Sequence, residues 1–278
     1  MEATLRYVKY ALAAPVIDVV LRAFPALCRR SPPWRAINYG GVADYLSNGD
    51  SVVNSMVRLA KLKPGDRLLE LGMGIAGNAT ALLRRFGDGV DYMGFDAVAY
   101  GVTWSRQHFA RLSNRYRFDH GDIYNSFYNP RGKIQPTEYR FPYADASADL
   151  AFANSVFTHM QPPELQHYFR ETARVLKPGG RVWFTFFLLD EDSEQRIKAG
   201  RARYTFQHPQ GVCRVESAVE PDVAVAYPTA WIKEQLAEAG FDEMTIERSS
   251  WRGNEAPSLQ DVVVAVRRLN TMDSGGVA

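Results

Sequence analysis

The 278-residue sequence contains only two cysteines, and its charges almost cancel. Cys28 and Cys213 lie far apart, so they match neither a metal-binding spacing nor a disulfide framework. The 33 basic and 31 acidic residues leave a formal net charge of +2, which indicates no general attraction to nucleic acid or to anionic membranes. We therefore expect reduced thiols, a cytoplasmic location and no nucleic-acid partner.

A long uncharged hydrophobic run is also absent. Apolar residues recur at helical spacing over residues 5–24, but Asp18 and Arg22 interrupt them before the roughly 20 residues that a membrane span requires. No uncharged core leads to a small-residue cleavage site, so a signal peptide is not expected. Two interpretations stay open: the helix packs on the domain as a lid or homodimer element, which we favour, or it rests on a membrane surface. In the second case five basic side chains would face lipid headgroups: Arg6, Lys9, Arg22, Arg29 and Arg30.

Predicted strands and helices alternate from residue 67 onward. Apolar segments at residues 67–71, 91–95, 115–119, 150–153 and 182–189 are typical of strands, and the segments between most of them are typical of helices. Such alternation indicates an α/β fold with a parallel, doubly wound sheet.

The chain divides into an accessory segment, a main domain and a tail. We expect an N-terminal helical segment, a domain with two loop insertions, and a disordered end: residues 1–50, residues 51–269 with insertions at 124–148 and 190–228, and residues 270–278. The first helix of the domain is expected to begin at a Ser51 cap. Both insertions follow strand ends on the side where open α/β sheets bind ligands, so we expect them to wall a substrate pocket.

A glycine-rich turn follows the first predicted strand. Gly72, Gly74 and Gly77 match the G-x-G-x-x-G pattern of nucleotide-binding βαβ units, where glycine permits a tight turn and close approach of a ligand. Glu70 lies two residues before this turn. Its carboxylate would repel the pyrophosphate of a dinucleotide and attract an ammonium or sulfonium group. The motif therefore favours S-adenosylmethionine (SAM) over NAD.

The segment from Glu70 to Gly77 resembles the first motif of the class I SAM-dependent methyltransferases. The resemblance extends in register from about Pro64 to Val266. It implies a Rossmann-like, seven-stranded and mostly parallel sheet, closed by a C-terminal antiparallel hairpin at residues 243–249 and 261–267. The segment Leu176–Gly180 resembles the turn before the fifth strand.

The resemblance also implies which residues contact the cofactor. Beyond Glu70 and the three glycines, Asp96 corresponds to the acid that holds both ribose hydroxyls. Asp122, followed by Ile123, corresponds to the acid that meets the adenine amino group. Asn154 ends the fourth strand, beside the methionine moiety.

The expected chemistry needs no covalent nucleophile, and the sequence has no G-x-S-x-G motif. In-line methyl transfer requires alignment of the acceptor and removal of its proton. His159 follows the fourth predicted strand and is the candidate base, with a helix cap or a backbone hydrogen bond as the structural alternative. Asp190 ends the fifth strand and is expected to pair with His159 or to bind a substrate hydroxyl. The acidic residues beside it have no spacing that demands a metal, so none is assigned.

Aromatic residues of the first insertion are expected to line the acceptor pocket: Tyr124, Tyr128, Tyr139, Phe141 and Tyr143. Trp34 and Trp251 lie in loop-like contexts and could reach the same pocket, whereas Trp183 is expected in the core.

These observations favour methyl transfer from SAM to a hydroxyl of a small molecule, such as a sugar or a lipid-linked precursor. Residues 154–157 read Asn-Ser-Val-Phe, which departs from the Asn/Asp-Pro-Pro-Tyr/Phe motif of the family's DNA-methylating members. N- or C-methylation of a small metabolite stays open. An NAD-dependent oxidoreductase and a non-catalytic SAM-binding protein are weaker alternatives.

Overall fold

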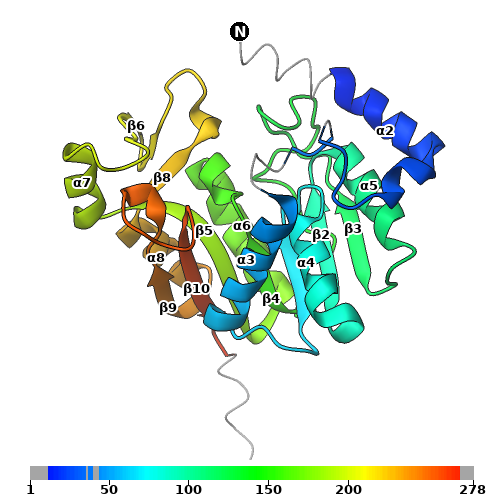
Figure 1. The fold of residues 1–278 in the computed structure, drawn as a ribbon. Coiled ribbons are helices and arrows are strands. Elements are labelled where there is room, and N and C mark those ends of the chain that lie inside the picture. The colour runs from blue at the N-terminus through cyan, green and yellow to red at the C-terminus, as the bar shows by residue number, and fades with distance from the viewer. Residues whose placement is uncertain (1–11, 36, 40–43, 270–278) are drawn as a thin grey trace, which may run out of the picture.

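The computed structural model describes residues 12–35, 37–39 and 44–269. Its main sheet has the spatial order β3-β2-β1-β4-β5-β10-β9, in which β1 to β5 are parallel and β10 runs antiparallel to both of its neighbours (Figure 1). The seven strands are β1 (Arg67–Leu71), β2 (Asp91–Asp96), β3 (Tyr116–His120), β4 (Ala148–Ala153), β5 (Leu176–Leu189), β9 (Phe241–Glu247) and β10 (Asp261–Arg267). The predicted α/β sheet with its C-terminal antiparallel pair is confirmed.

Helices cover both faces of this sheet. One core contains side chains of α3 (Tyr45–Leu59), α4 (Gly77–Phe86) and α5 (Ala99–Phe109), and the other contains side chains of α6 (Pro162–Val175) and α8 (Thr229–Glu238). Along β1 successive side chains alternate between them: Leu68 packs in the first core and Leu69 in the second. A strand buried on both faces reads as a continuous apolar run, which is why the sequence predicted it.

The segment predicted as a turn before β5 is instead the irregular first part of that strand. Leu176 pairs with Ala148 of β4, and the register then shifts so that Arg181 pairs with Leu150. Gly179, with φ of 75°, lies among the extra residues of this bulge.

The second insertion, predicted as a loop, contains regular secondary structure. It contains α7 (Glu191–Lys198), β6 (His208–Gln210), β7 (Cys213–Val215), η5 (Pro221–Val223) and β8 (Val225–Pro228). β8 pairs in parallel with the last residues of β5, and β7 and β6 continue outward from it. This small extension lies on the opposite side of the molecule from α5 (Figure 1).

The predicted start of the first domain helix at Ser51 is wrong. α3 begins at Tyr45, capped by the Asp44 carboxylate, which accepts a hydrogen bond of 3.1 Å from Leu46 N–H. The predicted boundary after residue 50 therefore falls inside a helix. Gly49 is needed inside this helix, because a Cβ there would lie only 2.7 Å from the carbonyl oxygen of Gly77.

Two further elements precede α3: α2 (Ala14–Ala23) and η2 (Pro25–Arg29). α2 packs against α5, with Leu21 buried in the core and Asp18 hydrogen-bonded to Thr103. The tail predicted as disordered, and Arg6 and Lys9 of the predicted N-terminal helix, lie outside the described residues. Within the described ranges, no helix combines the length and apolar character needed to cross a membrane.

Candidate active site

A cavity of about 1410 Å³ opens beyond the carboxyl ends of β1, β2 and β4. α3, the chain around Tyr39 and the first insertion form part of its wall, together with the segment that leads into β10. The cavity is larger than the roughly 300–1,000 Å³ of a typical single-ligand site. It has room for a cofactor and a second molecule side by side.

The glycine turn borders this cavity. Gly72 and Gly74 have φ of 64° and 59°, a left-handed conformation that favours glycine. A Cβ on Gly72 would lie 2.6 Å from the Val156 side chain, whereas a Cβ on Gly74 would meet nothing within 4 Å. The space where a side chain of residue 74 would project is therefore empty, and Gly77 is the first residue of α4. All three glycines line the cavity.

Glu70 lines the cavity from the end of β1, but its side chain is only 1% exposed. Asn78 Nδ2 donates to Oε1 at 2.6 Å, and the Tyr92 hydroxyl donates to Oε2 at 2.5 Å. Among the described residues, no Lys, Arg or His forms an ion pair with it. Burial therefore dominates and raises the pKa of Glu70 to about 8. A cationic ligand beside this carboxyl would stabilise its charged form.

Asp96, at the end of β2, lies beside the same turn. Its carboxylate accepts hydrogen bonds from Gly74 N–H and Val98 N–H, each at 2.8 Å, and from the Tyr39 hydroxyl at 3.1 Å. Burial raises the pKa of Asp96 to about 6. A carboxylate has about four lone-pair positions, so three donors leave room for one more. The Tyr39 hydroxyl has one proton, which it shares between Asp96 and the Gly74 carbonyl oxygen at 2.8 Å.

Of the three remaining predicted cofactor residues, two line the cavity and one does not. Ile123 and Asn154 line the cavity, at the carboxyl ends of β3 and β4. Asp122 does not line it; its carboxylate accepts a long hydrogen bond of 3.4 Å from Asn129.

His159 lies in η4 (Phe157–His159) and lines the cavity, with its ring edge-on to Tyr128 at a centroid separation of 6.0 Å. Its Nδ1 lies 2.8 Å from the backbone carbonyl oxygen of Asp222, so the backbone hydrogen bond expected as the structural alternative is present. A carbonyl can only accept, so Nδ1 carries the proton and Nε2 holds the free lone pair. Burial lowers the pKa of His159 below its usual value, which favours this neutral form.

Asp222, which the sequence analysis did not single out, therefore orients His159. Its carboxylate accepts hydrogen bonds from Gln161 Nε2, at 3.0 Å, and from the Ser126 hydroxyl. Ser126 belongs to the first insertion and Asp222 to the second. The pair joins both insertions at His159, although the two residues are 96 positions apart in sequence.

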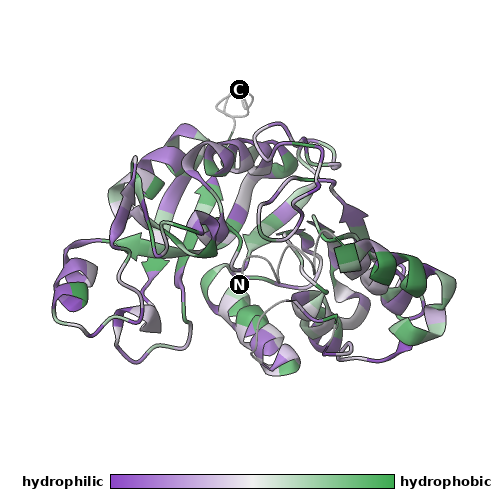
Figure 2. Ribbon diagram, turned by 90° about the horizontal axis from the view of Figure 1, so that it is seen from above, coloured by the Kyte–Doolittle hydropathy of each residue, from purple (hydrophilic) through white to green (hydrophobic). Residues whose placement is uncertain are grey.

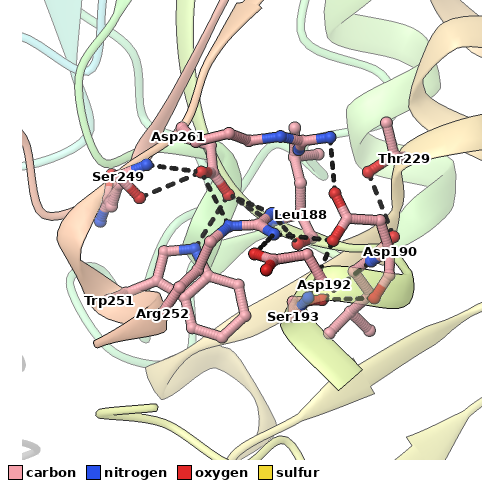
Figure 3. A network of polar contacts seen from close by, with 12 residues as sticks. Leu188, Asp190, Asp192, Ser193, Thr229, Ser249, Trp251, Arg252 and Asp261 are labelled. Atoms are coloured by element: carbon pink, nitrogen blue, oxygen red, sulfur yellow. Dashed lines mark hydrogen bonds and ion pairs between the residues drawn. The ribbon is translucent and has the colours of Figure 1, made fainter. Parts of the chain in front are cut away.

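Asp190 does not pair with His159, so that prediction is wrong. Its carboxylate caps α7 by accepting from Ser193 N–H at 2.9 Å and binds Arg252 Nη1 at 2.7 Å (Figure 3). Asp190 is not among the cavity-lining residues. Burial alone would raise its pKa, but hydrogen bonds from Arg252 and Ser193 outweigh it and hold the pKa below the usual value. The acidic cluster around it serves a helix terminus and an arginine. Among the described residues, no group of three potential ligands could hold a metal.

Several aromatic predictions also need correction. Tyr124 and Tyr128 line the cavity as expected, but three aromatic residues farther along the insertion pack in the core instead: Tyr139, Phe141 and Tyr143. Trp251 is fully buried in a separate cluster with Phe187 and Phe206. Trp183, expected only in the core, also lines the cavity.

A protein-family model matches the part of the chain that forms this site. Residues 69–184 match the model described as a methyltransferase domain, which spans β1 to β5 and therefore the glycine turn, Asp96 and His159. Residues 69–184 therefore form a methyltransferase domain of the class I SAM-dependent kind.

Two curated relatives extend this comparison. The 27-O-demethylrifamycin SV methyltransferase of Amycolatopsis mediterranei is 28% identical over 245 residues, which cover 78% of this methyltransferase and 82% of the relative. The 24-methylenesterol C-methyltransferase 2 of Oryza sativa is 31% identical over 147 residues, which cover 51% of the chain and 35% of the relative. A solved SAM-dependent methyltransferase from Methanosarcina mazei shares the fold, with a TM-score of 0.53 and 17% identity, over 77% of this chain and 98% of that one.

S-adenosylmethionine is accordingly the cofactor of this methyltransferase, and the cavity fits it. The bare backbone at Gly74 allows close approach, and the buried carboxyl of Glu70 has no cationic partner among the described residues. These features would suit a ligand that carries both a nucleoside and positive charge. The match to a methyltransferase domain replaces the alternative interpretations as an NAD-dependent oxidoreductase or a non-catalytic protein.

Proposed function

We propose that this methyltransferase acts on a hydroxyl of a small molecule and that His159 removes the hydroxyl proton. The single observation that carries this proposal is the hydrogen bond from His159 Nδ1 to the Asp222 carbonyl. It leaves Nε2 as the basic atom of a residue that lines the cavity. The lowered pKa keeps the ring neutral, and so able to accept a proton, at neutral pH.

We assign the cofactor to the part of the cavity between the glycine turn and Asp96. Glu70 would favour its positive charge, Asp96 would accept its ribose hydroxyls, and Ile123 would pack against its base. When bound, the cofactor supplies an electrophilic methyl group. Asp122 is less well placed than these residues, because it does not line the cavity.

A ribose diol brings two donors to Asp96, which has about one free lone-pair position. Tyr39 therefore has to give up its hydrogen bond to this carboxylate when both ribose hydroxyls bind. Gly101 permits the present position of Tyr39, because a Cβ there would lie 2.2 Å from the tyrosine hydroxyl.

Oxygen is the favoured acceptor atom because the relative that spans most of the chain is named for O-methylation. The sterol relative, named for C-methylation, matches only 51% of the chain, so carbon is the second candidate. A general base next to the transferred methyl suits a hydroxyl, whose proton must leave as the new bond forms.

The test uses His159→Gln and His159→Ala with a panel of hydroxylated acceptors that starts with 27-O-demethylrifamycin SV. Turnover, followed as S-adenosylhomocysteine released, is expected to fall by about 10²–10⁴. The affinity for S-adenosylhomocysteine should change little. The wild-type rate should rise with pH through the lowered pKa of His159 and level off at or below neutral pH. Full turnover by both variants would contradict the assigned base, and a methylated carbon in the product would contradict the acceptor.

A second pair of variants tests how His159 is held. Asp222→Ala removes the contacts to Gln161 and Ser126, so we expect about tenfold slower turnover and a displaced acidic limb of the pH profile. Asp222→Asn keeps an acceptor for Gln161 and should recover part of the loss. An unchanged pH profile in Asp222→Ala would show that Asp222 does not position the base.

A further inference from the structure

The helix α2 has apolar side chains on two sides, but the domain covers only one of them. Ala14, Ile17 and Leu21 face the core beside α5. The opposite side is exposed to solvent, and its apolar residues are spaced at helical intervals that continue into η2. Its exposed fractions are large: Val16 62%, Val19 64%, Val20 40%, Phe24 61% and Leu27 39%. We call these five residues the α2–η2 face.

This exposure is unusual for a helix of such composition. An α-helix that is apolar nearly all round is normally buried on all sides. Its two charged residues, Asp18 and Arg22, lie 2.8 Å apart and neutralise each other, and Asp18 also bonds Thr103. Figure 2 shows α2 as a largely hydrophobic ribbon at one edge of the molecule. The α2–η2 face therefore needs a cover that the described part of the chain does not provide.

The charges beside the face indicate what covers it. Arg29, Arg30 and Arg35 are exposed, and none forms an ion pair within the described ranges. The only acid between residues 12 and 35 is Asp18, already paired with Arg22. Trp34 is 49% exposed, with the Arg30 guanidinium 4.7 Å from its ring centre. Tryptophan and arginine beside an apolar helical face are typical of a membrane interface.

We propose that the α2–η2 face rests on a membrane surface that contains anionic lipids. The apolar side chains would enter the boundary between headgroups and acyl chains, and the arginines would contact the phosphates. A second copy of the chain is a poorer cover. A two-fold contact through this face would bring the two arginine groups together, without an unpaired acid from this segment to compensate. One side of the helix packs against α5, and the proposal assigns the other side to lipid.

The experiment measures flotation of the full chain with two kinds of vesicle. One is pure phosphatidylcholine, and the other also contains about 30% of the anionic lipid phosphatidylglycerol. We expect binding to the mixed vesicles, weaker binding to pure phosphatidylcholine, and release by added salt. Val16→Ser/Val19→Ser/Phe24→Ser should bind the mixed vesicles at least about tenfold more weakly, because the buried apolar area is lost. Arg29→Gln/Arg30→Gln should lose about fivefold per arginine on mixed vesicles only.

The matched control is Val219→Ser, since Val219 is 89% exposed but lies in the second insertion. It should bind vesicles like the wild type. Near-ultraviolet circular dichroism and affinity for S-adenosylhomocysteine confirm that each variant is folded. Absence of wild-type binding to the mixed vesicles would overturn the proposal. So would a wild-type dimer that the triple serine variant dissociates while vesicle binding stays unchanged.

Discussion

Two groups of acids lie at the sheet edge formed by the carboxyl ends of the parallel strands, and they have opposite surroundings. Glu70 and Asp96 border the cavity, are held by neutral donors, and have raised pKa values. Asp190 and Asp261 lie around the guanidinium of Arg252, which is 1% exposed and contacts both carboxylates (Figure 3). Asp261 also accepts from Trp251 Nε1 and from the backbone N–H of Leu188.

The presence or absence of a cationic partner distinguishes a structural carboxylate from a ligand-binding one. In the Arg252 network, each acid already has its counter-charge inside the fold, so a ligand would add nothing. At the cavity, the positive charge is missing from the described protein, and the raised pKa values record that absence. We infer that Asp190 and Asp261 hold the fold together, whereas Glu70 awaits a cationic group and Asp96 awaits the ribose hydroxyls of the ligand.

The largest effect is expected from breaking the Arg252 network. Arg252→Met would leave the 0%-exposed Asp261 without its counter-charge. Breaking a buried pair in this way typically costs about 3–5 kcal/mol of unfolding free energy. Urea denaturation measures the loss. Arg268→Met is the matched control, because the Arg268–Asp242 pair is about half exposed and should contribute less than about 1 kcal/mol. Equal losses in both variants would refute the contrast.

A smaller effect is expected at Glu70. Above pH 8 its carboxylate is charged, so Glu70→Gln should weaken cofactor binding by about 1.5–3 kcal/mol, or about 10- to 150-fold. Below pH 8, wild-type affinity should fall by about tenfold per pH unit, since the carboxyl must lose its proton to pair with a cation. Isothermal titration with S-adenosylmethionine, which carries both an ammonium and a sulfonium group, measures both between pH 6.5 and 8.5. Identical pH slopes for the two proteins would remove Glu70 from the cation site.

The same residue predicts the stability of the ligand-free protein. The pKa of Glu70 is raised from 4.5 to about 8, so folding favours the protonated carboxyl. Its contribution to stability is complete below pH 4.5 and is lost as the pH rises through 8. Relative to Glu70→Gln, the wild type should therefore become less stable over that window. Thermal unfolding without ligand tests the sign, and the opposite trend would mean that Glu70 already has a counter-charge.

The smallest effect concerns Tyr39, which shares Asp96 with the expected ribose. Tyr39→Phe removes the competing donor, so S-adenosylhomocysteine should bind more tightly by about 0.5–1.5 kcal/mol, or about two- to tenfold. Tyr45→Phe is the control, because that hydroxyl bonds the Ile75 carbonyl and Thr80 rather than Asp96. Weaker binding by Tyr39→Phe would mean that Tyr39 helps to hold the cofactor.

Much of the cofactor side was predictable because its parts are close in sequence. Glu70 and the three glycines share one strand and turn, and all line the cavity. Helix and strand positions also followed from apolar spacing. The start of α3 was missed because Ser51 offered a capping residue within the helix, and only the position of the Gly77 carbonyl explains the glycine at position 49.

The acceptor side was predicted less well because its contacts join distant segments. Asp190 was chosen for its place at a strand end, but Arg252, 62 residues away, occupies its carboxylate. Asp222 and Tyr39 carried no motif, and nothing in their local sequence could have placed them beside His159 and Asp96.

The sequence by itself determined the alternating strands and helices, the glycine turn and the acids near the ends of β1 and β2. Local spacing of apolar residues and glycines is sufficient for these features, whereas the seven-stranded sheet followed from the resemblance to the methyltransferase family. Only the tertiary structure decided which acids are paired, which nitrogen of His159 is basic and which side of α2 remains open. Those properties depend on neighbours from distant segments, because a buried charge or a proton is stabilised by whatever lies within a few ångströms of it.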